Sequence, residues 1–215
     1  ESAFLTPDAI SLVSDWSILN TQNQADYIII THPTFRDAAT RLAVARSSAG
    51  LHALVINIED IYNAFGYGSN TAEPIRRFLN YAYYHYSGTP VALVTLLGDA
   101  SWDPKRNLNN PDIDAADRSN QQSFIPTFGE PVSDFYFSLV DYGDLDTLQP
   151  KMVIARIPVS TAADADAYID KLIEYESAQP SDWNHKFVFV AGGDEGFQHT
   201  EFVLQDQSYI DASGI

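Results

Sequence analysis

The 215-residue sequence contains no cysteine, and this absence excludes a whole class of chemistry. Without a thiol, the chain can form no disulfide, no cysteine-ligated zinc site and no thiolate nucleophile from its own residues. Any cysteine-dependent reaction in which the chain takes part must therefore use a cysteine from outside these residues.

Long apolar runs are absent and basic residues are scarce. No apolar run approaches the roughly 20 residues of a membrane span, so we expect no membrane insertion. Twelve Lys and Arg stand against 29 Asp and Glu, which gives a formal net charge of -17. Such a field repels phosphate backbones and anionic lipid, so we expect no nucleic-acid partner. It suits solubility above all, and also cationic substrates or bound cations.

Apolar residues make up 45% of the sequence, which is enough for one substantial core. Short β-branched runs alternate with segments of helical apolar spacing. The predicted strands are 25–31, 51–58, 91–97, 152–157 and 187–191, with 134–140 as a strand or hairpin arm. The predicted helices are 34–49, with Thr34 as a possible cap, 59–65, 71–86, with Pro74 in its first turn, and 161–176.

This alternation predicts an α/β fold, because a strand–helix–strand unit with short connections forms a parallel sheet covered by helices. We expect a three-layer sandwich with a mostly parallel, caspase-like sheet, and a flavodoxin-like sheet is the alternative. Residues 1–24 are interpreted as a lead-in segment, and residues 100–131 as a long polar loop. The abrupt first and last residues suggest an excised or incomplete domain.

Ligands of such sheets bind beyond the carboxyl ends of the strands. Three loops with acidic or histidine residues are expected there, namely 98–99, 141–146 and 192–199, and we expect them to converge on one rim. The turn 141–146 has three aspartates around Gly143, and a flexible set of oxygen ligands suits calcium. Asp99 and the carbonyl of Val140 could add ligands. A solvated acidic turn is the simpler alternative.

The remaining candidates lie near the end of the chain. Asp194 and Glu195 follow a predicted strand and could orient a catalytic histidine or bind a cationic group, although a solvated acidic loop is the simpler explanation. No histidine pair has the spacing of a zincin helix, no serine lies in a G-x-S-x-G elbow, and Gly192-Gly193 lacks a phosphate-loop pattern. His32 is interpreted as structural, and His199 is the histidine that we single out.

An ordered series of segments between about residues 25 and 200 resembles the gingipain-type cysteine peptidases of family C25. The likeness is greatest to the PorU-like members associated with type IX secretion. The segments are ADYIIITHP at 25–33, IRRFL at 75–79, LLGDASWD at 96–103, IPT at 125–127, SDFY at 133–136, IARIPV at 154–159 and DKLIEYE at 170–176.

The resemblance implies a caspase-like fold and a secreted or cell-surface peptidase that acts on protein or peptide substrates. Its catalytic histidine and cysteine would lie downstream, so residues 25–215 resemble the N-terminal half of a catalytic domain, with the remainder of that domain as a partner. A non-catalytic binding or scaffold module of a secreted bacterial protein is the alternative.

The resemblance also implies roles for individual residues. Glu195, or alternatively Asp194, matches the carboxylate that orients the catalytic histidine. His199 matches a histidine in a loop associated with calcium. Asp99, Val140, Asp144 and Asp146 match the ligands of another calcium site of the family. Lys151 departs from the pattern, because relatives often have an acidic residue there and an ammonium group would compete with the metal.

Overall fold

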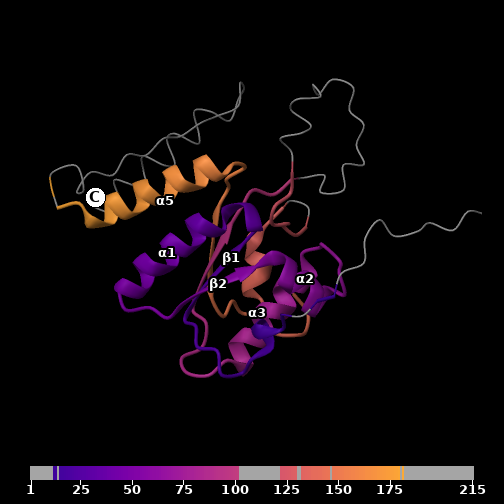
Figure 1. Cartoon of the computed structure of the whole chain (residues 1–215). Coiled ribbons are helices and arrows are strands. Elements are labelled where there is room, and N and C mark those ends of the chain that lie inside the picture. Colours follow the sequence, from indigo (N-terminus) through magenta and orange to yellow (C-terminus); the bar gives the residue numbers. More distant parts are fainter. Residues whose placement is uncertain are drawn as a thin grey trace, which may run out of the picture. The chain divides into compact units, whose positions relative to one another are not determined.

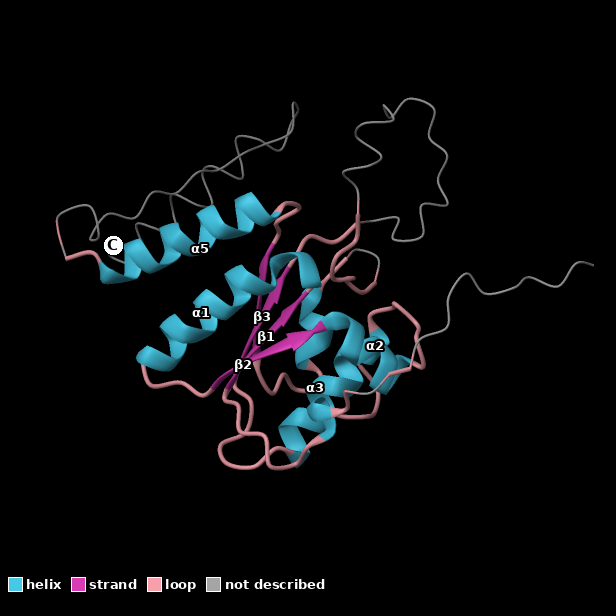
Figure 2. Ribbon diagram, in the orientation of Figure 1, coloured by secondary structure: helices cyan, strands magenta, loops and turns pink. Residues whose placement is uncertain are grey.

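A computed structural model describes residues 12, 13, 15–101, 122–129, 132–145, 147–179 and 181. The chain divides into two compact units, residues 1–176 and 177–215, and the architecture described below is that of the first. Its centre is a sheet of four parallel strands in the order β2-β1-β3-β4 (Figure 2). The strands are β1 (Tyr27–Thr31), β2 (Ala53–Asn57), β3 (Leu93–Leu97) and β4 (Val153–Ile157). The four predicted strands that fall within the described residues are confirmed.

Helices cover both faces of this sheet and make three layers (Figure 1). The α-helices are α1 (Arg36–Ser48), α2 (Ile58–Gly66), α3 (Glu73–His85) and α5 (Ala162–Ser177). Three 3₁₀-helices accompany them, η1 (Ser17–Leu19), η2 (Pro33–Phe35) and η3 (Asp134–Ser138). α1 and α5 cover one face, while α2, α3 and η3 cover the other.

The alternating side chains of β1 show why its sequence is apolar throughout. Ile29 belongs to the core under α1 and α5, whereas Ile28 and Ile30 belong to the core under α2 and α3. All five residues of β1 are buried. Because neighbouring residues of a strand point to opposite faces, a central strand covered on both sides has no solvent-facing position.

The starts of α2 and α3 follow from local sequence. The side chain of Asn57 accepts a hydrogen bond from the backbone N–H of Glu59 and so caps α2. Pro74 lies in the first turn of α3, as predicted, where its missing N–H leaves no helical bond unmade. The carboxyl end of β2 therefore leads directly into the N-terminus of α2.

The prediction of a strand or hairpin arm over 134–140 is wrong. Residues 134–138 form η3, in which the hydroxyl of Ser133 caps the N–H of Phe135 and Phe137 is fully buried. The carbonyls that follow η3 are bonded by side chains of α3 rather than by a strand, since Arg76 donates to Leu139 and Asn80 donates to Val140. This segment is the crossover from β3 to β4, and it returns the chain to the amino end of the sheet.

Candidate functional site

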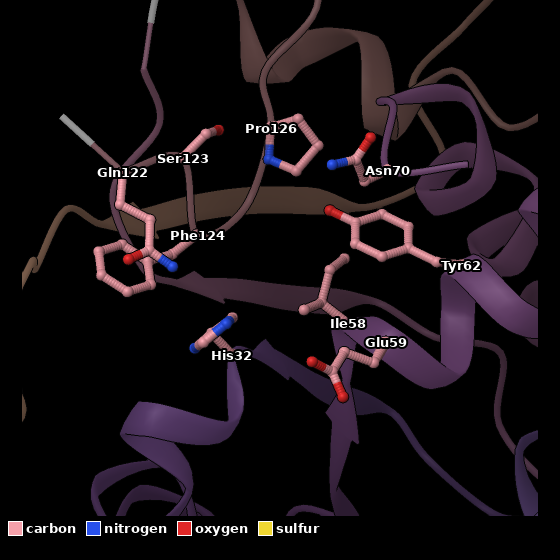
Figure 3. Close-up of a pocket in the computed structure, with 9 residues that line it drawn as sticks. All are labelled: His32, Ile58, Glu59, Tyr62, Asn70, Gln122, Ser123, Phe124 and Pro126. Carbon is pink, nitrogen blue, oxygen red and sulfur yellow. The ribbon is translucent and has the colours of Figure 1, made fainter. Parts of the chain in front are cut away.

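A cavity of about 280 Å³ lies at the carboxyl ends of β1 and β2. Figure 3 shows the side chains that surround it, which come from the turn after β1, from α2 and the loop after it, and from residues 122–126. They are His32, Ile58, Glu59, Tyr62, Asn70, Gln122, Ser123, Phe124 and Pro126. This position, beyond the carboxyl ends of parallel strands, is where α/β sheets commonly bind ligands.

His32 is the residue directly after β1, and its ring has a fixed orientation. Its Nδ1 accepts a hydrogen bond from the backbone N–H of Thr34 at 3.2 Å, so His32 caps η2. Thr34 lies inside η2 and does not cap α1, which starts two residues later, at Arg36. The ring of Phe124 meets the imidazole edge-on, with 5.1 Å between centroids.

This arrangement favours one form of the His32 ring. Burial lowers the pKa of His32, while the nearby Glu59 carboxylate opposes that shift. With Nδ1 used as an acceptor, the neutral imidazole carries its proton on Nε2. His32 thus provides a neutral N–H donor at neutral pH. Its cap on η2 is a structural role, as predicted from the sequence.

Two further polar side chains reach the cavity from successive turns of α2. Glu59 brings a carboxylate, and Tyr62 brings a phenol whose pKa is strongly raised by burial. Tyr62 therefore remains protonated at any physiological pH and can both donate and accept a hydrogen bond. In Figure 3 the Tyr62 hydroxyl and the Asn70 amide face each other across one side of the cavity.

The opposite wall, residues 122–126, is held by Arg156 of β4. The guanidinium donates to the carbonyls of Gly98 and Ile125, each at 2.8 Å, and makes two bonds of 2.7 Å to the carboxylate of Asp134. Phe124 and Ile125 also donate their N–H groups to the carbonyl of Asp99. Backbone and ion-pair bonds together fix this wall against the ends of β3 and β4.

Asp99, a predicted calcium ligand, lies at this same end of the sheet. One of its carboxylate oxygens accepts the N–H of Ala100 at 2.8 Å, and the other is 3.5 Å from the hydroxyl of Ser160. Its backbone N–H donates to Val159. The described contacts of Asp99 are thus those of a residue that closes the turn after β3.

Val140 and Asp144 lie at the other end of the sheet. The N–H of Lys151, just before β4, donates to the carbonyl of Ser138, which places this turn beside the start of β4. Asp99 follows the far end of β3, six residues beyond Leu93, so the two places are about 20 Å apart along the strands. The expected convergence of the loops 98–99 and 141–146 on one rim is therefore wrong.

The acidic turn itself is partly neutralised by Lys151. Its ammonium lies 3.2 Å from the carboxylate of Asp141, which also accepts a hydrogen bond from the hydroxyl of Tyr84. The Tyr84 hydroxyl, followed by Lys151, lowers the pKa of Asp141. Asp146, Asp194, Glu195 and His199 lie outside the described residues, as does the predicted strand 187–191.

The described part of the chain contains no group of three His, Asp or Glu side chains that could hold a metal ion. It also contains no helix long and apolar enough to cross a membrane. The cavity around Glu59 and Tyr62 was not identified from the sequence. A signal was present, because His32 and Glu59 each directly follow a predicted strand.

Three comparisons relate the chain to known proteins. The family model described as Peptidase family C25 matches residues 20–213. No curated protein matches the sequence. The crystal structure of dimeric latent PorU from Porphyromonas gingivalis has 27% identity and a TM-score of 0.56, over 71% of this chain and 16% of that chain. A second solved structure, described as that of a protease, has 20% identity and a TM-score of 0.47, over 70% of this chain and 28% of that chain.

The chain thus spans less than a third of the length of either solved structure. The strand order β2-β1-β3-β4 also occurs in flavodoxin-like sheets, and the PorU match supports the caspase-like α/β sandwich instead. The resemblance noted in the sequence is confirmed. Because the family model covers nearly all of its length, the chain belongs to peptidase family C25, the gingipain-type peptidases.

Proposed function

We propose that the chain is the N-terminal part of the catalytic domain of a secreted or cell-surface cysteine endopeptidase or transpeptidase of gingipain type. The observation that carries this proposal is the family match over residues 20–213, together with a parallel sheet that aligns with latent PorU. Proteins or peptides would be its substrates, and the rest of the catalytic domain its first partner. The likeness to PorU supports an association with type IX secretion.

The chemistry requires groups beyond this chain. A downstream cysteine thiolate would attack the peptide carbonyl, and a downstream histidine would take the thiol proton and return it to the leaving amine. Glu195, with Asp194 as the alternative, would accept a hydrogen bond from the histidine ring and hold its orientation. The chain alone, which has no cysteine, should be inactive.

The test uses the full-length protein, because this chain spans less than a third of the length of the two solved structures. A cysteine that follows a His-Gly pair downstream is changed to Ala, and Glu195→Gln and Asp194→Asn are made in parallel. Peptide hydrolysis is measured with reductant and calcium, with and without limited proteolysis, since the PorU structure is that of a latent form.

We expect the cysteine variant to lose all activity and one carboxylate variant to lose at least tenfold in kcat, with a changed pH profile. A full-length protein without that cysteine, or one inactive in every condition, would instead support a non-catalytic binding or scaffold module. Surface labelling of intact cells tests the location separately.

We further propose that the turn 140–146 binds calcium through the carbonyl of Val140 and the carboxylates of Asp144 and Asp146, with His199 at a separate calcium loop. Closely spaced oxygen ligands around the bend at Gly143 support this assignment. The distance along the strands removes Asp99 from the set. The ammonium of Lys151 is already bonded to Asp141 and stays out of the ligand set.

Thermal unfolding with and without chelator tests the calcium site. We expect chelation to lower the melting temperature by several degrees, and Asp144→Asn or Asp146→Asn to abolish most of that response. Asp99→Asn serves as the matched control and should respond to chelator like the parent chain. Melting curves that are identical with calcium and with chelator would rule the site out.

A further inference from the structure

We propose that a hollow on the α1 and α5 face of the sheet binds a small, uncharged apolar molecule that carries one carbonyl oxygen. The hollow has a volume of about 450 Å³, within the range of about 300–1,000 Å³ for small-molecule sites. The proposal does not rest on the peptidase function proposed above, because it uses none of the residues assigned there.

The floor of the hollow is an apolar part of the sheet. Leu93 of β3 and Val153 and Ala155 of β4 line it. These residues share one face of the sheet, because side chains of a strand point alternately to its two faces. Val153 is 63% exposed and Ala155 is exposed as well. An apolar molecule placed on this floor would remove that surface from water, which favours binding.

Two hydroxyl groups lie in the same lining. Tyr27 and Thr95 each line the hollow, and each residue is only 6% exposed. Their hydroxyls share one hydrogen bond of 2.6 Å between β1 and β3. Two hydroxyls carry two protons, and only one proton can lie between the two oxygens. In the part of the chain that the structure describes, neither hydroxyl donates to a further acceptor, so one proton remains available.

This available proton defines what the ligand must bring. Water accepts such a proton as long as a site is open to solvent. A purely apolar ligand would cover the hydroxyl and leave it unbonded, which weakens binding. A ligand with a carbonyl oxygen supplies an acceptor in place of the water and keeps the bond. The hollow therefore favours an apolar molecule with one acceptor over a purely apolar molecule of the same shape.

The charges around the hollow exclude an ionised ligand. Arg46 is the only charged residue in the described lining, and its two terminal nitrogens bond the carboxylate of Glu176 at 2.5 and 2.8 Å. The net charge of -17 adds a field that repels a carboxylate. No Asp, Glu or His occurs in the described lining, so a cation or a metal ion finds no ligand there.

The experiment titrates acetophenone into the isotope-labelled 215-residue chain and follows backbone amide signals by NMR. We expect saturable shifts centred on residues 93–95 and 153–155. Ethylbenzene, which has a CH₂ group in place of the carbonyl, should bind about fivefold more weakly, because the hydroxyl proton then loses its acceptor. Benzoate, which has a similar size and a negative charge, should bind at least tenfold more weakly.

A double variant tests the hydroxyl pair. Either hydroxyl alone would still carry a proton to donate, so Tyr27→Phe and Thr95→Val are combined. Replacing both partners of a hydrogen bond by apolar groups of the same shape is nearly neutral for stability, so the variant should fold. We expect acetophenone and ethylbenzene to bind it with equal affinity.

A second pair of variants tests the location. Ala155→Leu fills the hollow from an exposed position and should abolish the saturable shifts. Val44→Leu enlarges another exposed apolar residue, outside the lining, and should change the acetophenone affinity less than twofold. The proposal is overturned if acetophenone gives no saturable shifts, if ethylbenzene or benzoate binds the parent chain as tightly, or if the double variant keeps the preference for acetophenone.

Discussion

The two ends of the parallel sheet differ in how their polar groups are used. At the carboxyl end, side chains around the cavity leave the Ser123 hydroxyl without a partner among the described residues and the Glu59 carboxylate facing open volume. Toward the amino end, Asn80 of α3 bonds the carbonyl of Val140, and Tyr84 and Lys151 bond the carboxylate of Asp141.

This difference teaches that the number of acidic residues does not by itself locate a cavity. The turn with the most aspartates, for which we propose calcium, has its Val140 carbonyl and its Asp141 carboxylate bonded by side chains of α3 and Lys151. The cavity has only one carboxylate in its lining, and it lies where the chain passes from strands into the starts of helices. Position relative to the strand ends is the stronger indicator of a binding site.

The largest expected effect comes from Arg156→Ala at the carboxyl end. The substitution leaves the partly buried carboxylate of Asp134 without its partner and frees the carbonyls of Gly98 and Ile125. We expect a loss of about 2–4 kcal/mol in the free energy of unfolding, because a partly buried carboxylate and two carbonyls lose their donor. Urea unfolding measures it.

Arg156→Lys is the companion variant. A lysine keeps the charge but cannot bond Asp134 through two nitrogens while also reaching two carbonyls. An intermediate loss, with amide shifts at residues 122–126, is expected. If Arg156→Ala is as stable as the parent chain, Arg156 does not hold the cavity wall.

The next largest effect is expected for Arg76→Ala, on the α3 side. Arg76 is 8% exposed and donates to the carbonyls of Leu139 and Asp141, both at 2.5 Å, and its guanidinium lies over the ring of Tyr136. Removing it leaves two carbonyls without these donors, and we expect a loss of about 2–4 kcal/mol. Urea unfolding again provides the measurement.

Arg77→Ala is the matched control on the same helix. Arg77 is exposed and pairs with Glu73 one turn away, an arrangement worth about 0.3–0.5 kcal/mol. If Arg76→Ala and Arg77→Ala lose the same free energy of unfolding, the bonds of Arg76 to the crossover segment contribute no more than an exposed ion pair on a helix.

The sheet could be predicted from the sequence because β1 and β3 are apolar runs of strand length, and helical patterns follow β1 and β2. Membership of the family could be predicted as well, because several short segments occur in the right order. The error lay in 134–140, where alternating aromatics suggested a strand although Phe137 packs as part of a 3₁₀ turn.

That error had a consequence for the candidate site. If β3 and β4 are parallel and consecutive, the residues just before β4 must lie at the amino end, whatever their composition. Applied to the sequence, this rule separates Asp99 from Asp144 without any coordinates. The bonds of Arg76 and Arg156 to backbone carbonyls could not be predicted, because they join residues more than 20 positions apart and a carbonyl carries no sequence signal.

The smallest effect is expected when the pH is lowered. It tests His32, which lies at the carboxyl end of the sheet. Burial lowers the pKa of His32 below its ordinary value of 6.5, so the unfolded chain binds this proton more readily than the folded chain. The contribution of His32 is therefore undiminished above pH 6.5 and is lost as the pH falls from 6.5 toward the lower folded-state pKa. His32→Asn keeps an acceptor for the N–H of Thr34 but cannot be protonated.

In urea unfolding at pH 7.5 and 5.5, the parent chain should lose more stability than His32→Asn between the two values. An identical loss in both proteins would show that the ring is as free to take up a proton in the folded chain as in the unfolded one, and the cavity would then lack the neutral donor assigned to it.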